Sequence, residues 1–371
     1  MLYFVQKFLK GSVISSSLLN KKLKVALTYN VKPEENISGE RTPLSSNSNA
    51  IKNFNDTYAE WDSIETINAI KDSLQLYHEV IMIEANEDAF EKFRNIKPDI
   101  VFNVAECANS TSREAQIPAM LDMLQIPYSG SDPLTLTTCL DKARTKEVLS
   151  YHGIPTSKFL LLEALRDLEK FNLRFPVIMK PVAEGSSKGI FDSSLINNIG
   201  ELKSRLTELF SEYNQPFLLE EFLPGREFTV AILGNEEESI VLPIVELNLH
   251  ELPSHLAPIY SYEAKWVVDT KDNPLNIFSC PAKITYDLAR IISDTALRTY
   301  KVLRCKDWSR IDIRLDANGI PNVIEINPLP GVLPDPNDNS CYPKAARTAG
   351  LSYQEMINKV LNAAIKRHNL T

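Results

Sequence analysis

The stretch 310–331, RIDIRLDANGIPNVIEINPLPG, alternates apolar and polar residues, passes through a turn, and then alternates again. Strand side chains point to opposite faces with a period of two, so this pattern predicts a β-hairpin. The apolar residues of the first arm would share a face with Ile324 and Ile326 of the second arm. Residues 316–319, DANG, supply the turn between the arms. The chain must therefore provide a hydrophobic layer beneath one face of this hairpin.

The opposite face of the predicted hairpin is polar. It carries Arg310, Asp312, Arg314 and Asp316 on the first arm and Glu325 and Asn327 on the second. Two interpretations are open, and the simpler one is a charged face that meets water. The other is a cation site, because hard divalent metals prefer carboxylate and amide oxygens.

Length and charge limit the class of protein. With 371 residues the chain suits two or three domains, because single hydrophobic cores stop growing beyond about 250–300 residues. Apolar residues make up 44% and charged residues 24% of the chain, as in globular proteins, and the formal net charge is -8. This acidic balance argues against a broad nucleic-acid surface. No apolar run approaches the roughly 20 residues that span a bilayer, so no membrane partner is expected.

The cysteines carry no motif. They are five in number, scattered, and free of CxxC or Cys–His spacing. Such a pattern predicts reduced thiols and a cytoplasmic location, and argues against a structural zinc site.

Strands and helices alternate in the first part of the chain, which predicts a parallel α/β sheet. We expect strands at 22–30, 78–85 and 99–104, with helices near 64–77, 87–95 and 113–124. The predicted division of the whole chain is a tail at 1–22, an N-terminal α/β domain at 23–130 with a loop insertion at 31–58, a small α+β domain at 131–220 and a third domain at 221–371. Ser352 and Glu355 have the spacing of a capping box and predict the start of a last helix.

Three further stretches contain residues that are suited to binding a ligand. In 179–190, MKPVAEGSSKGI, a predicted strand ends at Lys180 and runs into a loop of small residues, whose backbone N–H groups can approach phosphate oxygens. It is neither a Walker A loop nor a dinucleotide-binding motif, and alone it is more simply a mobile surface turn. The stretch 218–230, LLEEFLPGREFTV, places Glu227 where a carboxylate can hold a ribose diol, although solvated strand-end charges are commoner. In 260–268, YSYEAKWVV, Lys265 lies between aromatic residues and alone is simply an exposed lysine.

Together these features indicate a chemistry that none of them indicates alone. They comprise a Gly/Ser loop, a ribose-type acid, an oxygen-only hairpin and three lysines for phosphates, Lys142, Lys180 and Lys265. This inventory is what metal-assisted phosphoryl transfer from a nucleotide requires.

The order and spacing of the motifs also resemble the ATP-grasp superfamily and, within it, the D-alanine–D-alanine ligase-like family. The resemblance covers 23–371 and rests on CLDKARTK, IMKPVAEGSSKGI, EEFLPGREFTVAIL, YEAKW and SRIDIRLDANG…VIEINPLPG, in that order. It implies a three-domain fold with a parallel α/β N-terminal domain, a small central lid domain and a C-terminal catalytic domain. The nucleotide would lie between the central and C-terminal domains.

The resemblance also implies a role for particular residues. The ATP contacts it implies are Lys142 and Lys180 at the phosphates, Glu220, Glu221 and Leu223 on the adenine side, Glu227 at the ribose and Lys265 closing over the phosphates. The ligands it implies for two Mg²⁺ ions, with Mn²⁺ as a substitute, are Asp312, Glu325 and Asn327. The catalytic and substrate positions it implies are Arg310 and the Gly331 N–H at the reacting carbonyl, Ser186 in the lid loop, and Glu60 at the first amino acid's ammonium.

The implied reaction is the ligation of two small amino-acid substrates by way of an acyl phosphate, with release of ADP and phosphate. It needs no covalent nucleophile from the protein. Family members are often homodimers, which implies the same state here.

The sequence departs from the family at four places. The 31–58 insertion precedes Glu60, the family's histidine is missing near Glu114, Trp266 replaces a tyrosine or phenylalanine, and a longer segment follows Gly331, where Ser340 is the counterpart of a substrate serine. All four lie at the amino-acid pockets. Three hypotheses follow: a ligase that makes D-Ala-D-Ala for the cell wall, a related ligase for other amino acids or peptides, and a non-catalytic ATP-binding protein. The third hypothesis is disfavoured because the chain has the arginine and metal-ligand residues that catalysis would need, Arg310, Asp312, Glu325 and Asn327.

Overall fold

The computed structural model describes residues 22–33, 58, 60–212, 215–269 and 274–370. The tail predicted at 1–22, apart from its last residue, and most of the insertion predicted at 31–58 lie outside these described residues. Three sheets organise the described part of the chain.

The N-terminal sheet is parallel, with strand order β2-β1-β3. Its elements are β1 (Lys24–Tyr29), α2 (Ile64–Gln75), β2 (Glu79–Glu84), α3 (Ala89–Ile96), β3 (Ile100–Asn103) and α4 (Gln116–Leu124). The parallel α/β arrangement predicted from alternating strands and helices is therefore confirmed. The helix expected at 113–124 begins instead with a 3-10 turn at Arg113–Ala115, and Pro118 in the first turn of α4 has no N–H to extend α-helical bonding backwards.

The central sheet is antiparallel, with strand order β4-β7-β5-β6. Its strands are β4 (Phe159–Leu162), β5 (Val177–Pro181), β6 (Leu195–Ile196) and β7 (Phe217–Glu221), and the helices around it are α5 (Pro133–Leu140), α6 (Lys142–Tyr151) and α7 (Ile199–Glu212). Leu202, Leu206 and Leu209 repeat at helical spacing on α7 and bury that face against the sheet. This gives the central sheet a hydrophobic core of its own.

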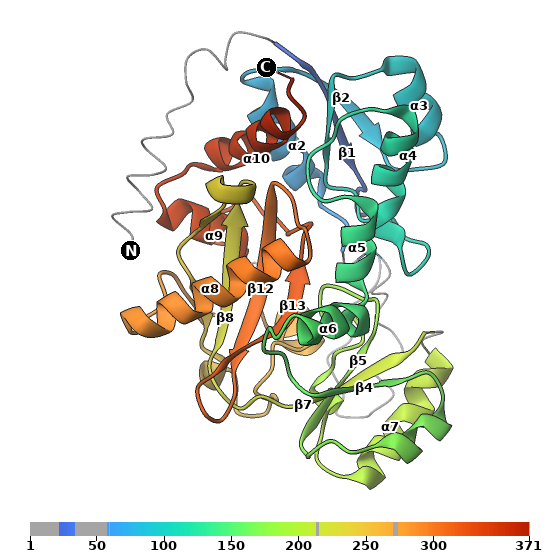
Figure 1. Ribbon diagram of the computed structural model, residues 1–371, viewed down its shortest axis with the longest axis vertical. Coiled ribbons are helices and arrows are strands. Elements are labelled where there is room, and N and C mark those ends of the chain that lie inside the picture. The colour runs from blue at the N-terminus through green and yellow to red at the C-terminus, as the bar shows by residue number, and fades with distance from the viewer. Residues whose placement is uncertain (1–21, 34–57, 59, 213–214, 270–273, 371) are drawn as a thin grey trace, which may run out of the picture.

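The C-terminal sheet is antiparallel, with strand order β11-β10-β8-β12-β13, and β9 pairs with β8. Its elements are β8 (Glu227–Leu233), β9 (Ile240–Val241), β10 (Val245–Leu247), β11 (Phe278–Ser279), α8 (Tyr286–Val302), β12 (Trp308–Leu315), β13 (Pro321–Asn327), α9 (Cys341–Thr348) and α10 (Tyr353–Arg367). Helix α8 packs against β8, β12 and β13, whereas α9 packs against β8 and β10 (Figure 1). The predicted capping box starts α10, where the Ser352 N–H donates to Glu355 Oε2 at 2.7 Å.

The predicted hairpin is formed by β12 and β13, with Asp312 opposite Glu325. The pairing then shifts, so that Ile313 lies opposite Val323, and Ile324 is the extra residue of a β-bulge. The expectation that Ile324 shares the buried face with Ile326 is therefore wrong. Val323 takes that place in the core, because the bulge interrupts the alternation and turns Ile324 toward a cavity.

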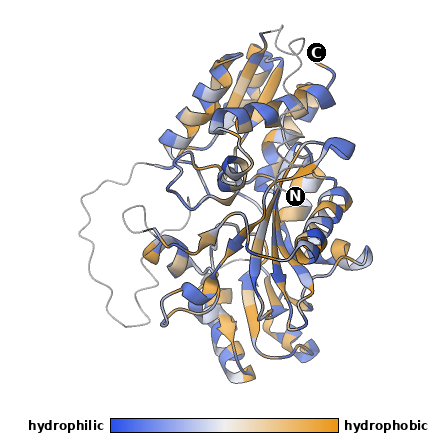
Figure 2. Cartoon of the chain, turned by 90° about the vertical axis from the view of Figure 1, so that its left-hand side faces the viewer, coloured by the Kyte–Doolittle hydropathy of each residue, from blue (hydrophilic) through white to orange (hydrophobic). Residues whose placement is uncertain are grey.

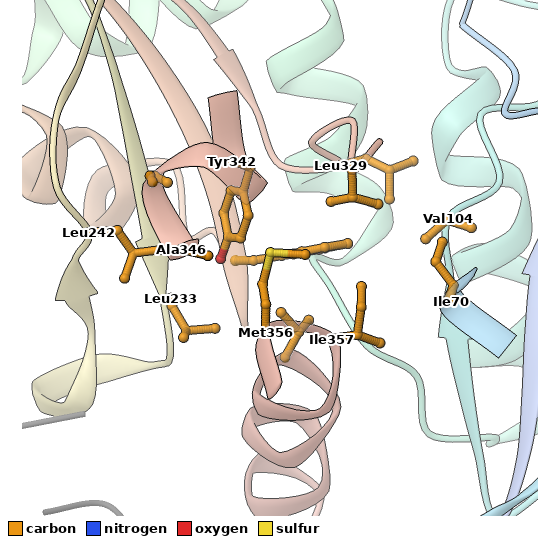
Figure 3. Close-up of a cluster of buried hydrophobic side chains, with 14 of the residues drawn as sticks. Ile70, Val104, Leu233, Leu242, Leu329, Tyr342, Ala346, Met356 and Ile357 are labelled. Atoms are coloured by element: carbon orange, nitrogen blue, oxygen red, sulfur yellow. The ribbon is translucent and has the colours of Figure 1, made fainter. Parts of the chain in front are cut away.

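One hydrophobic core joins the two ends of the chain. Helix α10 packs against α2, and Figure 3 shows Met356 and Ile357 lying between the C-terminal sheet and the pair Ile70 and Val104. The three-domain division of the sequence stays a prediction, and the shared core makes the N-terminal and C-terminal sheets one body. The helices carry hydrophobic and hydrophilic residues on different faces, as expected of elements that cover a core (Figure 2).

Two expectations from composition concern the described residues only. No helix in this part of the chain has both the length and the apolar character to cross a membrane. All five cysteines are free.

Candidate active site

A cavity of about 270 Å³ lies between the central sheet and the C-terminal sheet. Its walls include every residue to which the sequence assigned a role except Asn327. Asn327 lines an adjoining cavity of about 120 Å³, hereafter the side cavity, whose walls share Lys142, Arg310 and Glu325 with the main one. The structure thus brings together residues from Glu60 to Gly331 in one continuous cleft.

A buried charge network closes the end of the cleft between β5 and β7. Glu220 Oε1 lies 3.1 Å from Lys180 Nζ, and Glu220 Oε2 lies 3.1 Å from Lys146 Nζ. The Ser157 hydroxyl also donates to Glu220 at 2.7 Å. Burial alone would raise the pKa of Glu220, but Lys146 and Lys180 lower it to about 2. Glu220 is therefore an ionised acceptor at neutral pH.

Lys146 was not identified as a site residue from the sequence. It follows Lys142 by four residues on α6, which places both side chains on one face of the helix. Its ammonium also donates to Thr156 Oγ1 at 2.7 Å and Ser157 Oγ at 3.1 Å. The i,i+4 spacing in CLDKARTK was the signal that could have found it.

The polar face of the β12–β13 hairpin holds alternating charges. Arg310 donates to Asp312 Oδ2 at 2.9 Å, while Thr229 on β8 donates to Asp312 Oδ1 at 2.7 Å. On the second arm, Lys142 Nζ lies 3.0 Å from Glu325 Oε1. Burial raises the pKa of Glu325, but Lys142 and Arg310 outweigh it and the pKa is lowered. Glu325 is therefore held as an anion, and both carboxylates line the cleft.

The donor set of this hairpin fits a hard divalent cation. Asp312 and Glu325 lie on paired positions, and Asn327 Nδ2 lies 3.4 Å from Asp312 Oδ2, so two carboxylates and one amide converge. Within the described residues no group of three or more His, Cys, Asp or Glu side chains could hold a metal ion. A cation here would need the Asn327 amide and oxygens from a ligand besides the two carboxylates, so the Mg²⁺ assignment stays a prediction.

Glu227, the predicted ribose-binding residue, is buried at the start of β8. Arg314 on β12 donates to its Oε2 at 3.1 Å. Burial raises the pKa of Glu227 although Arg314 opposes that effect. Arg314 also stacks over the Phe222 ring at 4.6 Å, and the sequence did not assign it to the site. The alternation of β12 was the available signal, since Arg314 shares a face with Asp312.

Two loops meet over the cleft. Ser186 and Ser187 have φ angles of 51° and 61°, which non-glycine residues seldom adopt. The Trp266 indole N–H donates to the Ser186 carbonyl at 3.1 Å, and the Ser187 hydroxyl donates to the Tyr260 carbonyl at 3.0 Å. Beneath them, burial and the nearby Arg310 lower the pKa of Lys265 to about 8. This lysine can therefore change charge near neutral pH.

Glu60 was predicted to hold an ammonium group, and it is already paired. Arg113 donates to both of its oxygens, at 2.7 and 2.8 Å, and the Gly185 N–H donates to Oε1 at 2.8 Å. A Cβ at Gly185 would lie 2.5 Å from that oxygen, so a larger residue there would displace the Glu60 carboxylate from its present bonds to Arg113 and the Gly185 N–H. Arg113 was not identified from the sequence, because its partner Glu60 lies more than fifty residues away along the chain.

The remaining predicted positions lie on the cleft walls. Glu221 points away from the buried network and pairs with Arg174 at 2.8 Å, whereas Leu223 contributes an apolar side chain to the main cavity. The Ser340 hydroxyl donates to the Gly331 carbonyl at 3.2 Å, which ties the long segment after Gly331 back to its start.

The side cavity adds two acids, Glu106 and Glu114, that were given no role from the sequence. Both follow β3 along the chain, and Glu114 is only 8% exposed. Burial and the negative charge of Glu60 raise the pKa of Glu114 to about 7. Burial likewise raises the pKa of Glu106. These carboxylates reduce the stability of the protein whenever they are ionised.

A Glu114→Gln variant tests whether the ionised Glu114 carboxylate lowers the free energy of unfolding. The pKa of Glu114 in the folded state, about 7, lies above its usual 4.5, so folding favours the protonated form and stability falls as pH rises from about 4.5 to about 7. We expect the variant to exceed wild type in free energy of unfolding by about 2 kcal/mol near pH 8, and not to exceed it near pH 5. Chemical denaturation at both pH values measures this. The exposed Glu237→Gln serves as control, and equal stability near pH 8 would contradict the assignment.

Comparisons with known proteins agree on one family. A family model described as the D-ala D-ala ligase C-terminus matches residues 148–362. The chain is 36% identical over 300 residues to an uncharacterised protein, y4sG, of Sinorhizobium fredii, which covers 78% of this chain and 84% of that protein. It is 30% identical to a D-alanine–D-alanine ligase of Moorella thermoacetica, over 78% of this chain and 90% of that ligase.

Solved structures share the fold. One is a Bacillus anthracis D-alanine–D-alanine ligase complexed with ATP, with a TM-score of 0.65 and 21% identity, over 94% of this chain and 99% of that chain. Another is the Enterococcus faecalis VanG D-Ala:D-Ser ligase, with a TM-score of 0.67 and 23% identity, over 93% of this chain and 100% of that chain. At these identities the likeness shows a common three-dimensional arrangement.

Proposed function

Because this chain belongs to the D-Ala–D-Ala ligase C-terminal family of ATP-grasp proteins, we propose that it is an ATP- and Mg²⁺-dependent ligase that joins a carboxylate to an amine. One observation carries the proposal. Lys142, Lys180 and Lys265 line the same cavity as Asp312 and Glu325, between two antiparallel sheets. Ammonium groups that can bind phosphates and oxygen ligands that can bind magnesium therefore line one cavity. The loops that contain Ser186 and Trp266 lie over it.

The reaction has two steps. An oxygen of the substrate carboxylate attacks the γ-phosphorus of ATP, the bond to the β–γ bridging oxygen breaks, and ADP leaves. The amine nitrogen of the second substrate then attacks the acyl carbon of the resulting acyl phosphate, phosphate leaves, and the nitrogen loses a proton. The products are an amide, ADP and inorganic phosphate.

The protein's part is to bind, orient and neutralise charge. Lys142 and Lys180 would hold the triphosphate, and Lys265 would close over it. Mg²⁺ held by Asp312, Glu325 and Asn327 would neutralise negative charge on the phosphates. Arg310 has a buried Nε–H without a hydrogen-bond partner in the described structure. That free donor supports its assignment to the oxyanion of the second step, with the Gly331 N–H beside it.

The substrates are small amino acids or peptides, with D-alanine the first candidate because several relatives carry the name D-alanine–D-alanine ligase. A product of that kind would serve the cell wall. The pairing of Glu60 with Arg113 favours the second candidate, a ligase for other amino acids, because both Glu60 oxygens already accept hydrogen bonds from the Arg113 guanidinium. We place the enzyme in the cytoplasm, as a homodimer.

A screen of single amino acids and pairs, in both enantiomers, tests the proposal by ADP release with ATP and Mg²⁺. Release stimulated by D-alanine would support the first candidate, and release only with other amino acids the second. ATP without an amino acid is the matched blank. Absence of release with every acid and amine, in protein shown to bind ATP, would contradict the ligase function and favour a non-catalytic ATP-binding protein.

A further inference from the structure

A third cavity, hereafter the outer cavity, lies beside the lid loop at 183–188. It has a volume of about 220 Å³, and its walls come mainly from this loop and from the segment 107–113 that follows β3. Ala108, Ser110 and Thr111 on its wall are exposed, so the outer cavity communicates with solvent. Water can therefore approach the reaction site from this side unless something closes the way.

Four charged side chains, hereafter the gate, lie between the outer cavity and the reaction site. They are Glu60, Arg113, Glu184 and Lys188. Glu60 and Glu184 line the main, side and outer cavities, whereas Arg113 and Lys188 line the outer one alone among these three spaces of the described structure. The two cations thus lie on the outer side of two acids that face the reaction site. Their charges balance, so the gate needs no ligand of either sign.

Arg113 is the central member of the gate and is only 4% exposed. Its guanidinium donates to both oxygens of Glu60, at 2.7 and 2.8 Å, and to the Ala183 carbonyl at 2.8 Å. It also lies 3.6 Å from Glu184 Oε2. Arg113 and Glu60 belong to the N-terminal part of the chain, whereas Ala183 and Glu184 belong to the lid loop. One side chain therefore fastens the lid loop to the N-terminal part.

The other contacts of the gate are weaker without Arg113. The Gly185 N–H donates to Glu60 Oε1 at 2.8 Å, and Lys188 Nζ lies 2.9 Å from Glu184 Oε2 but 3.9 Å from Glu60 Oε2. Removing one partner of a buried ion pair is costly, because the remaining charge loses its compensation. Loss of Arg113 would leave the Glu60 carboxylate held by one short hydrogen bond and the Ala183 carbonyl without its donor. We therefore expect the lid loop to open more often.

The gate lies on a path from the outer cavity to the reacting carbonyl. Glu60 and Glu184 border the side cavity, which Arg310 and Gly331 also line. In the proposed reaction these last two residues face the acyl phosphate. Water that reached this intermediate would attack its acyl carbon, phosphate would leave, and the acid would regain its carboxylate with one oxygen from water. ATP would then be consumed without amide formation, which a closed site prevents.

We propose that Arg113 is a positioning residue that keeps the gate shut during ligation and so protects the acyl phosphate from water. This inference rests on the proposed ligase function and goes beyond it. Arg113 borders the outer cavity and acts on the reaction through Glu60 and the lid loop. Its loss separates ADP release from amide formation, whereas a residue that only supports the fold would affect both products equally.

The test measures ADP and amide together for Arg113→Met, with the acid and amine that give the most ADP in the amino-acid screen. The ratio of ADP to amide should rise about tenfold in the variant, because the lost charged hydrogen bonds keep the gate shut. In water labelled with a heavy oxygen isotope, the recovered acid should carry the label. Arg113→Lys keeps the charge but lacks the planar fork, so it should show a smaller rise of the same kind. Arg94→Met is the matched control, since Arg94 is an exposed arginine on α3 that pairs with Glu91.

An unchanged ratio in both Arg113 variants overturns the inference, and so does an equal loss of ADP and amide, which indicates a structural role. Hydrogen exchange of the lid-loop amides, in the full-length protein without substrates, separates the gate from the ligase function. Faster exchange at 183–188 in Arg113→Met, but not in Arg94→Met, supports the gate even if no protein forms an amide. Unchanged exchange overturns the gate even if ligation is observed.

Discussion

Alanine at Asp312 or Glu325 should reduce ATP-dependent ADP formation by about a thousandfold or more and leave the fold intact. Removing one of these charged groups from a phosphoryl-transfer site leaves charge on the phosphates uncompensated as the bond breaks. Stability should change little, because both side chains lie on the polar face of the hairpin while Ile311, Ile313 and Ile326 form the buried face. Coupled ADP assays and circular dichroism melts measure the two effects.

The hairpin offers a matched control for these variants. Asp316 lies in the turn between β12 and β13, where its Oδ1 accepts from the Asn318 and Ile320 N–H groups at 2.8 and 2.9 Å. Asp316→Asn keeps that acceptor and should retain activity. Asp312→Asn, by contrast, weakens a proposed metal ligand, so we expect excess Mg²⁺ to restore part of its activity. Near-normal turnover of either alanine variant would show that the metal assignment is wrong.

Alanine at Glu220 should cause the largest loss of stability, about 3–5 kcal/mol, because it leaves the buried ammonium groups of Lys146 and Lys180 without their shared counterion. The loss should be local to the central sheet, where β5 and β7 are neighbours. Hydrogen exchange of β5 and β7 amides measures it directly. The neighbouring Glu221→Ala is the control: its partner Arg174 is 82% exposed, so the change should cost under about 1 kcal/mol. Unchanged exchange in Glu220→Ala would contradict the network.

The lowered pKa of Glu220 predicts that the stability of the central sheet depends on pH. The pKa of Glu220 is lowered from 4.5 to about 2, so its stabilising effect is present above about pH 4.5 and disappears as pH falls toward 2. Glu220→Gln should remove this part of the pH dependence of exchange in β5 and β7. If the variant keeps the wild-type pH dependence, Glu220 does not titrate in this way.

Local patterns in the sequence were enough to identify most of the cleft. Alternation placed Asp312 and Glu325 on one face of a hairpin, because side-chain direction in a strand depends only on position. The same rule failed at Ile324, where a bulge depends on how β13 pairs with β12. The place of Glu106 and Glu114 on the wall of the side cavity was also beyond the sequence, because segments that lie far apart in the chain form that cavity.

The sequence by itself determined the class of fold, the parallel N-terminal sheet, the hairpin and the order of the nucleotide-binding motifs, because these depend on periodicity and on neighbours along the chain. Only the tertiary structure decided the pairing of charges. Ion pairs join Glu60 to Arg113, Glu227 to Arg314 and Glu220 to Lys146, and the partners in each pair are tens of residues apart in the sequence. Burial and ion pairing depend on distance in space, and a single sequence does not record which distant charges the folded chain brings together.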